Sequence, residues 1–201
     1  MFSPDNRFVI VADLGLDQLL VYRLDRAAGT LVRDPQIVRG VPGAGPRHLV
    51  FDGAGRHLYV INEMQSTVVA YGYDAANGTL GELQIVSALP KGFTRTSEAA
   101  EIDMHPSGNF LFASNRGDDS IAVFAVNAKD GTLTPVEIDS SGGKTPRNFV
   151  LDPTGAWLLA ANQYSDDIAV FRVDSSTGHL TESGEVLHVP SPVCVRFVPE
   201  R

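Results

Sequence analysis

Four copies of one short turn divide this chain: the sequence reads GTL at residues 29–31, GTL at 78–80, GTL at 131–133 and GHL at 178–180. The glycines of successive turns are 49, 53 and 47 residues apart. Self-similarity at a nearly fixed period is typical of proteins that place one supersecondary unit after another. A β-sandwich would also contain short strands, but it would not repeat its turn chemistry at such a period.

Each repeat contains short strands on both sides of its turns. Ahead of the GTL or GHL turn lies a strand that ends in an aromatic residue: LLVY at 19–22, VVAY at 68–71, IAVF at 121–124 and IAVF at 168–171. Further upstream lies another strand, preceded by a Pro/Gly-containing turn: FVIVAD at 8–13, HLYVIN at 57–62, FLFASN at 110–115 and WLLAAN at 157–162. An inner strand precedes the Pro/Gly-containing turn, and a weaker outer strand follows the GTL or GHL turn, so each repeat has four short strands. Without helical periodicity, they predict an all-β protein, a β-propeller with four blades of four-stranded antiparallel sheets.

The predicted repeats form a single domain over residues 1–201. Their expected ranges are residues 1–44, 45–97, 98–145 and 146–191, followed by a closing strand at 192–199. The fourth strand of each repeat is the least apolar, as an outer edge strand should be.

Composition excludes several classes of function. The net charge is −8 and the sequence contains no run of Lys or Arg, which argues against nucleic acid or an anionic membrane as a partner. No apolar stretch is long enough to span a membrane. A single cysteine, Cys194, and the absence of a basic and apolar leader favour a reducing, cytoplasmic location.

Polar residues gather at one predicted face of the propeller. The innermost strand and the next strand run in opposite directions, so the start of one and the end of the other meet around the central channel. The candidates at these positions are Arg47, His48, Glu101, Arg147 and Asn148, together with Asp13, Asn62, Glu63, Asn115, Arg116, Asn162 and Gln163. The repeated asparagines are expected to cap turns. The charged group is expected to be functional, because three guanidiniums, two carboxylates and an imidazole are costly to hold together without an anionic ligand.

The sequence gives no support for a metal or a cofactor. His57, His105, His179 and His188 fall in strands or turns away from the predicted face and are interpreted as structural. No two histidines and no Cys/His pair have the spacing of metal ligands. Dinucleotide, P-loop and nucleophile-elbow motifs are also absent from the sequence.

Three long segments carry a family resemblance: GPRHLVFDGAGRHLYVINEMQSTVVAY, AEIDMHPSGNFLFASNRGDDSIAVF and TPRNFVLDPTGAWLLAANQYSDDIAVF. They resemble the seven-bladed-propeller lactonases, a family that includes a bacterial type of 6-phosphogluconolactonase and a fungal carboxy-muconate lactonizing enzyme. The resemblance covers the whole chain and implies a metal-free lactone hydrolase or cycloisomerase. Motif by motif, the resemblance implies that the site residues are Arg47 and His48 of PRH, Glu63 of NE, Glu101 of AEI, Arg116 of SNRG and Arg147 of PRNF.

The leading hypothesis is hydrolysis of 6-phosphoglucono-δ-lactone, a step of the pentose phosphate route. His48, Glu63, Glu101 and Arg116 are the predicted catalytic residues, and Arg47, Arg147, Asn148 and Gln163 are the predicted substrate-binding residues. Glu63, Glu101 or neutral His48 would act as general base. Arg116 and Arg147 would hold the anionic group, and Arg47 would hold the carbonyl oxygen. A carboxy-muconate cyclase and a non-enzymatic binding scaffold are the alternatives.

The resemblance also implies further blades. A seven-bladed ring needs three more repeats than this sequence contains, so the missing blades of a parent propeller are expected partners, beside a small anionic sugar lactone or carboxylated substrate. An open arc would leave two apolar blade faces unpaired, which favours association.

Overall fold

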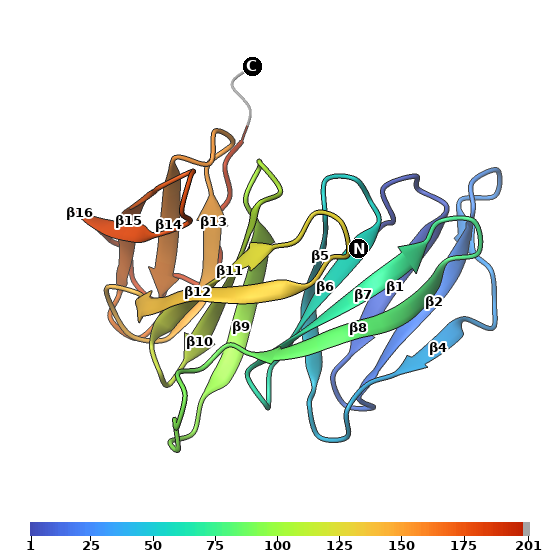
Figure 1. The fold of residues 1–201 in the computed structure, drawn as a ribbon, viewed down its shortest axis with the longest axis horizontal. Coiled ribbons are helices and arrows are strands. Elements are labelled where there is room, and N and C mark those ends of the chain that lie inside the picture. Colours follow the sequence, from blue (N-terminus) through green and yellow to red (C-terminus); the bar gives the residue numbers. More distant parts are fainter. Residues whose placement is uncertain (199–201) are drawn as a thin grey trace.

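The computed structural model describes residues 1–198 and contains four antiparallel sheets that follow one another along the long axis of the molecule (Figure 1). The first sheet consists of β1 (Phe8–Asp13), β2 (Gln18–Asp25), β3 (Thr30–Leu31) and β4 (Gln36–Arg39). The second consists of β5 (Pro46–Phe51), β6 (His57–Asn62), β7 (Thr67–Asp74) and β8 (Thr79–Ser87). The third consists of β9 (Glu98–Met104), β10 (Phe110–Arg116), β11 (Ser120–Val126) and β12 (Leu133–Ser140). The fourth consists of β13 (Pro146–Leu151), β14 (Trp157–Asn162), β15 (Asp167–Val173) and β16 (Leu180–His188).

This architecture confirms the predicted all-β propeller fold. In the second, third and fourth sheets the strands pair in sequence order, so each sheet is a meander of hairpins. In the first sheet, an isolated bridge between Phe2 and Val9 stands in place of a full inner strand. Its outer strand is split into β3 and β4, with Asp34 at a φ of 64° and Pro35 between them. Proline cannot donate a ladder hydrogen bond, which explains the interruption.

The core consists of three apolar layers, each between two successive sheets. One layer contains Phe8, Ile10, Leu58 and Val60, the next contains Tyr59, Ile61, Leu111 and Ala113, and the third contains Phe110, Phe112, Leu158 and Ala160. Alternate residues of one strand therefore face different neighbours, as the period of two along a strand requires. This explains why FLFASN and HLYVIN contain runs of consecutive apolar residues: both faces of these strands are covered.

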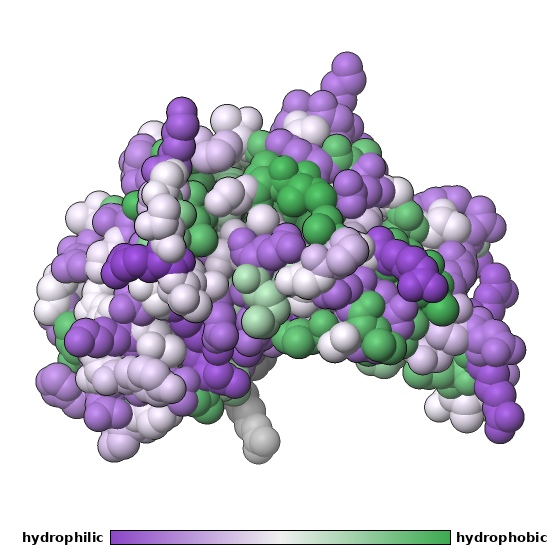
Figure 2. All heavy atoms as spheres, turned by 90° about the horizontal axis from the view of Figure 1, so that it is seen from below, coloured by the Kyte–Doolittle hydropathy of each residue, from purple (hydrophilic) through white to green (hydrophobic). Residues whose placement is uncertain are grey.

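The inner strands lie next to one another: β5 contacts β9, and β9 contacts β13. Seen from below, the molecule curves around a hollow on one side (Figure 2). Residues 192–198 follow the fourth sheet without joining a strand, so the closing strand remains a prediction, and residue 199 lies outside the described part. No helix among residues 1–198 has the length and apolar character needed to cross a membrane.

Candidate active site

Three inner strands present different side chains from equivalent positions. His48, Glu101 and Asn148 are each followed by an apolar residue. On the neighbouring strand, this apolar residue pairs with the residue that lies two positions before Asn62, Asn115 or Asn162. These register pairs are Leu49 with Val60, Ile102 with Ala113, and Phe149 with Ala160. His48, Glu101 and Asn148 are therefore one position of the repeat, filled by an imidazole, a carboxylate and an amide on neighbouring blades.

Hydrogen bonds link this position from blade to blade. The Nδ1 atom of His48 lies 2.6 Å from Oε1 of Glu101, and the side-chain amide of Asn148 donates to Oε2 of Glu101. The Oδ1 atom of Asn148 accepts from the backbone N–H of Val195 at 2.8 Å. Glu101 is only 5% exposed, and its own N–H donates to Oγ of Ser114. The carboxylate is thus fixed, and it fixes the orientation of the imidazole.

A second cluster joins the arginines to Glu63. The Nε atom of Arg47 lies 2.9 Å from Oε2 of Glu63, and Nη2 of Arg116 lies 2.8 Å from Oε1 of the same carboxylate. Arg116 also pairs with Glu98 at 3.3 Å and donates to the carbonyl oxygens of Glu98 and Ala99. The predicted convergence of Arg47, Glu63 and Arg116 on one face is therefore confirmed.

Arg47 connects the two clusters. Its Nη1 donates to Nε2 of His48 at 3.2 Å and to the carbonyl oxygen of Ala100 at 2.6 Å. The pairing register of β5 shifts between Pro46 and His48, so Arg47 sits in a bulge. Bulges turn side chains away from the regular alternation and are frequent beside active sites. The same shift occurs in β13 at Arg147, between Pro146 and Asn148.

Burial and neighbouring charges shift pKa values in and beside these clusters. Burial lowers the pKa of the Arg47 guanidinium; Glu63 opposes this effect, and the positive charges of Arg116 and Arg147 add to it. Arg147 therefore lies within electrostatic reach of Arg47, and it forms no ion pair with a carboxylate of the described residues. Burial also raises the pKa of the Asp103 carboxyl, two residues along β9 from Glu101.

The asparagines that end the second strand of each blade are structural, as predicted. The side-chain amides of Asn62, Asn115 and Asn162 donate to the first residue of the following strand: Thr67 at 3.0 Å, Ser120 at 3.2 Å and Asp167 at 2.9 Å. Asn115 and Asn162 also donate to the backbone carbonyl oxygens of Ala88 and Ser141, in the loops that lead into their own blades.

The other histidines lie outside this cluster. His57 contacts Asp52 at 2.8 Å, His105 contacts the carbonyl oxygen of Gly155 at 3.0 Å, and His179 contacts Glu137. His188 pairs with Asp167 at the end of β16. Gln163 follows Asn162 directly, at the position that Glu63 and Arg116 hold in the two preceding blades. Among the described residues, no hydrogen bond or ion pair joins its side chain to the two clusters.

A cavity of about 350 Å³ opens beside the linked histidine, with Arg47, His48, Glu101 and Arg196 among its lining residues. The Nη2 atom of Arg196 lies 3.8 Å from Oε2 of Glu101. Sequence reasoning missed Arg196, Glu98 and Ser114. Arg196 could have been found by extending the repeat, because Cys194 aligns with Asn148 and Arg196 lies two residues beyond it on the same face.

A comparison with known protein families shows which family the chain belongs to. The family described as "Lactonase, 7-bladed beta-propeller" matches residues 1–197. The chain belongs to this lactonase family. A 6-phosphogluconolactonase from Bacillus subtilis (strain 168) is 40% identical over 197 residues, which are 98% of this chain and 56% of the relative. A 6-phosphogluconolactonase from Formosa agariphila is 38% identical over 155 residues, which are 75% of this chain and 43% of the relative.

Two solved structures match the fold closely. A protein from Lactobacillus plantarum superposes with a TM-score of 0.93 at 38% identity, covering 99% of this chain and 57% of that one. The periplasmic gluconolactonase of Pseudomonas aeruginosa gives a TM-score of 0.93 at 37% identity, covering 99% of this chain and 56% of that one. The chain thus spans just over half the length of these two structures, and it contributes four sheets of a fold described as seven-bladed.

Proposed function

We propose that this chain carries the hydrolytic site of a 6-phosphogluconolactonase, which opens 6-phosphoglucono-δ-lactone to 6-phosphogluconate. The observation that carries the proposal is the imidazole of His48, bound through Nδ1 to a buried carboxylate and set through Nε2 against the guanidinium of Arg47. The names of the Bacillus and Formosa relatives support this substrate. The reducing conditions inferred from the single Cys194 support a cytoplasmic location.

His48 acts as the general base. Because Glu101 accepts the hydrogen bond of Nδ1, the proton resides on Nδ1 and Nε2 keeps a lone pair. The side chain of His48 is 42% exposed, so water can reach it. When the lactone binds, Arg47 donates its hydrogen bond to the lactone carbonyl oxygen instead of to Nε2 of His48. A water molecule then donates to Nε2 in place of Arg47.

The proposed reaction then runs in two steps. Nε2 takes a proton from the water while the water oxygen bonds to the lactone carbonyl carbon, and the resulting oxyanion is stabilised by Arg47. When the tetrahedral intermediate collapses, the bond from this carbon to the ring oxygen breaks. The imidazolium returns its proton to that ring oxygen, which becomes the hydroxyl of the open sugar acid. The new carboxyl group loses its proton to solvent.

The remaining residues support these two. Each oxygen of Glu63 is paired with a guanidinium, so we assign it to positioning Arg47 rather than to acting as base. The side chain of Arg116 is 11% exposed and committed to Glu63 and Glu98, so it shares this positioning role. Arg147 is a better anchor for the phosphate than Arg116. Asn148 orients Glu101, because both ends of its side-chain amide are occupied.

A coupled assay tests the proposal. The chain is incubated with 6-phosphoglucono-δ-lactone, and 6-phosphogluconate is followed through its dehydrogenase after subtraction of spontaneous hydrolysis. We expect a rate above background that falls by about 10²-fold or more in His48→Gln. His179→Gln is the matched control, because His179 also contacts a carboxylate but lies in a turn away from the site.

Parallel arms separate the alternatives. Cyclisation of a carboxylated muconate without lactone hydrolysis would assign the site to the cyclase activity of the family. Binding of 6-phosphogluconate, measured by calorimetry, without turnover of either substrate would leave a binding scaffold. Equal rates in the wild-type chain, His48→Gln and the blank would refute the proposed function.

A further inference from the structure

The linked position of the inner strand is held by strand pairing in two of the three blades. In the second blade His48 pairs with Ile61 of β6. In the fourth blade Asn148 pairs with Ala161 of β14. Ile61 and Ala161 are both apolar and fully buried, so neither side chain offers a hydrogen bond to its partner. The places of His48 and Asn148 in their strands therefore depend on the main chain and not on the side chain opposite.

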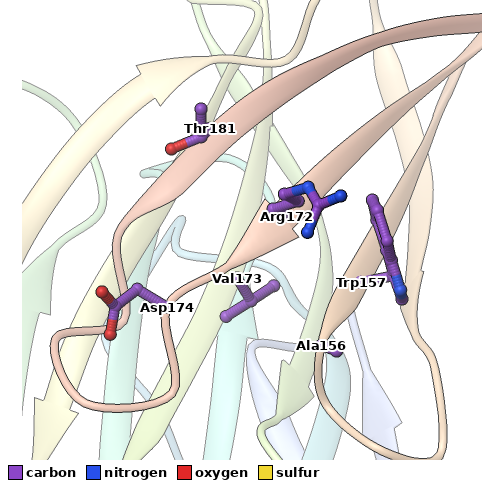
Figure 3. A pocket seen from close by; sticks show the side chains of 6 residues that line it. All are labelled: Ala156, Trp157, Arg172, Val173, Asp174 and Thr181. Carbon is purple, nitrogen blue, oxygen red and sulfur yellow. The ribbon is translucent and has the colours of Figure 1, made fainter.

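The fourth sheet shows how little an unbroken ladder depends on side-chain type. The pairing of β14 with β15 continues without a shift to its far end, where Trp157 pairs with Arg172. Figure 3 shows these two residues side by side on neighbouring strands, and the guanidinium lies 4.6 Å from the centroid of the tryptophan ring. Side chains as different as these fit opposite each other, because the main chain sets the register.

The third blade lacks this support at Glu101. The ladder between β9 and β10 breaks between Ala113 and Asn115, and Glu101 lies in the gap without a register partner. The backbone N–H of Glu101 donates instead to Oγ of Ser114 at 3.0 Å. Ser114 is fully buried, so solvent does not compete for this hydrogen bond. The place of Glu101 in its strand therefore depends on a side chain.

The hydroxyl occurs only where the ladder is open. The residues equivalent to Ser114, each one position before the end of the second strand, are Ala12, Ile61 and Ala161. Burying a hydroxyl is costly unless it is hydrogen-bonded, so a serine is expected in this row only where it has a partner. Glu101 provides that partner through its backbone N–H.

The open segment of β9 supplies the site through both of its residues. The carbonyl oxygen of Ala100 accepts from Nη1 of Arg47 at 2.6 Å. Oε1 of Glu101 lies 2.6 Å from Nδ1 of His48, and it also accepts from the backbone N–H of Ile102 at 3.2 Å. A shift of this segment would therefore disturb the guanidinium and the imidazole together.

We propose that Ser114 is a positioning residue of the site. It holds the open segment of β9 in place, and through the carboxylate of Glu101 it keeps the proton of neutral His48 on Nδ1. Because Ser114 is fully buried, it acts through Glu101 and not on the substrate. Its effect on the reaction rate rests on the proposed lactonase function, whereas its effect on the imidazole does not.

Nuclear magnetic resonance of the chain without substrate tests the effect on the imidazole. Long-range 15N–1H correlation shows which ring nitrogen carries the proton, and His48→Gln identifies the His48 signals among the five histidines. We expect the proton on Nδ1 in the wild type and a shift of the tautomer population toward Nε2 in Ser114→Ala. In the coupled assay, kcat of Ser114→Ala should fall about tenfold while KM stays near its wild-type value.

Two further variants sharpen the test. Ser120→Ala is the matched control, because Ser120 is also buried in the third sheet and its hydroxyl accepts from the side-chain amide of Asn115 at 3.2 Å. It should keep the wild-type tautomer and kcat. Ser114→Cys keeps a side chain of similar size with a weaker acceptor, so it should fall between the wild type and Ser114→Ala. Thermal melting identifies the variants that remain folded.

The outcomes separate this proposal from the proposed function. A wild-type His48 with its proton on Nε2, or an unchanged tautomer in the folded Ser114 variants, would overturn the role of Ser114. An equal shift in Ser120→Ala would overturn it too, because general loosening of the sheet would then explain the effect. In a chain that hydrolyses the lactone, a shifted tautomer with wild-type kcat would also contradict it. A shifted tautomer in a chain without lactonase activity would support the positioning role and refute the proposed function alone.

Discussion

Two sets of equivalent positions in the repeat behave in opposite ways. At the end of the second strand every complete blade has the same residue, Asn62, Asn115 or Asn162, and each amide donates to the start of the following strand. At the inner-strand position the residue changes from blade to blade, through His48, Glu101 and Asn148. His48 and Asn148 both form hydrogen bonds with Glu101.

The difference separates structure from function within one chain. A turn that every blade must make demands the same cap in every blade, so the residue repeats. A site at the centre of a propeller is made once, so each blade supplies a different group to it. Repetition therefore indicates a structural role, and variation among otherwise similar flanks indicates a functional one.

The largest expected effect is at the varying position. Glu101→Gln keeps a hydrogen-bond acceptor for Nδ1 of His48 but removes the charge that stabilises the imidazolium. We expect kcat to fall by about 10²–10⁴-fold with little change in Tm. Glu137→Gln, which alters the carboxylate beside His179, is the control and should leave kcat unchanged. Steady-state kinetics with the coupled assay measures both, and a similar kcat for the two variants would contradict the comparison.

The repeated position should show the reverse. Asn115→Ala removes an amide that donates to the carbonyl oxygen of Ala88 at 2.7 Å and to Ser120, in a fully buried setting. Leaving the buried carbonyl oxygen unpaired should lower the free energy of unfolding by about 1–3 kcal/mol. Urea denaturation gives this value, and kcat/KM per folded molecule should be unchanged. A loss of activity without a loss of stability would place Asn115 in the site.

Much of this arrangement could be predicted from the sequence, because turn chemistry and strand alternation are local signals. They gave the four sheets and the face on which Arg47, His48 and Glu101 meet. The partners of the charges could not be predicted. A bulge redirects Arg47 toward both Glu63 and His48, and pairing patterns alone do not reveal a bulge. Glu98 was missed because it lies one residue before Ala99, which is equivalent to Pro46, and so falls outside the motif that the repeats share.

Asn148 offers a finer test of the linked position. Asn148→Ala removes a hydrogen bond to the charged Glu101 and frees the backbone N–H of Val195. We expect kcat to fall about tenfold while KM stays near its wild-type value, since Asn148 acts through Glu101. Asn148→Asp should not restore kcat, because a second carboxylate would face Glu101. A rise in KM with constant kcat would instead indicate direct substrate binding.

The smallest effect concerns a histidine outside the site. The hydrogen bond to Glu137 raises the pKa of His179 above its ordinary value. Protonated His179 therefore stabilises the fold below the ordinary histidine pKa of about 6.5, and this stabilisation is lost as pH rises through the raised value. The difference in Tm between the wild type and His179→Gln should be small, largest at acidic pH and absent at alkaline pH. A difference that grows with pH would reverse the assignment.

A double-mutant cycle tests the central claim, that residues at one varying position of the repeat act together as a lactonase site. The kcat of His48→Gln, Glu101→Gln and the double variant is measured by the coupled assay at matched folded fractions. Because Glu101 works through His48, the double variant should be no slower than His48→Gln alone. Losses that multiply would show that the two residues act independently, and a His48→Gln variant with the wild-type rate would refute the site altogether.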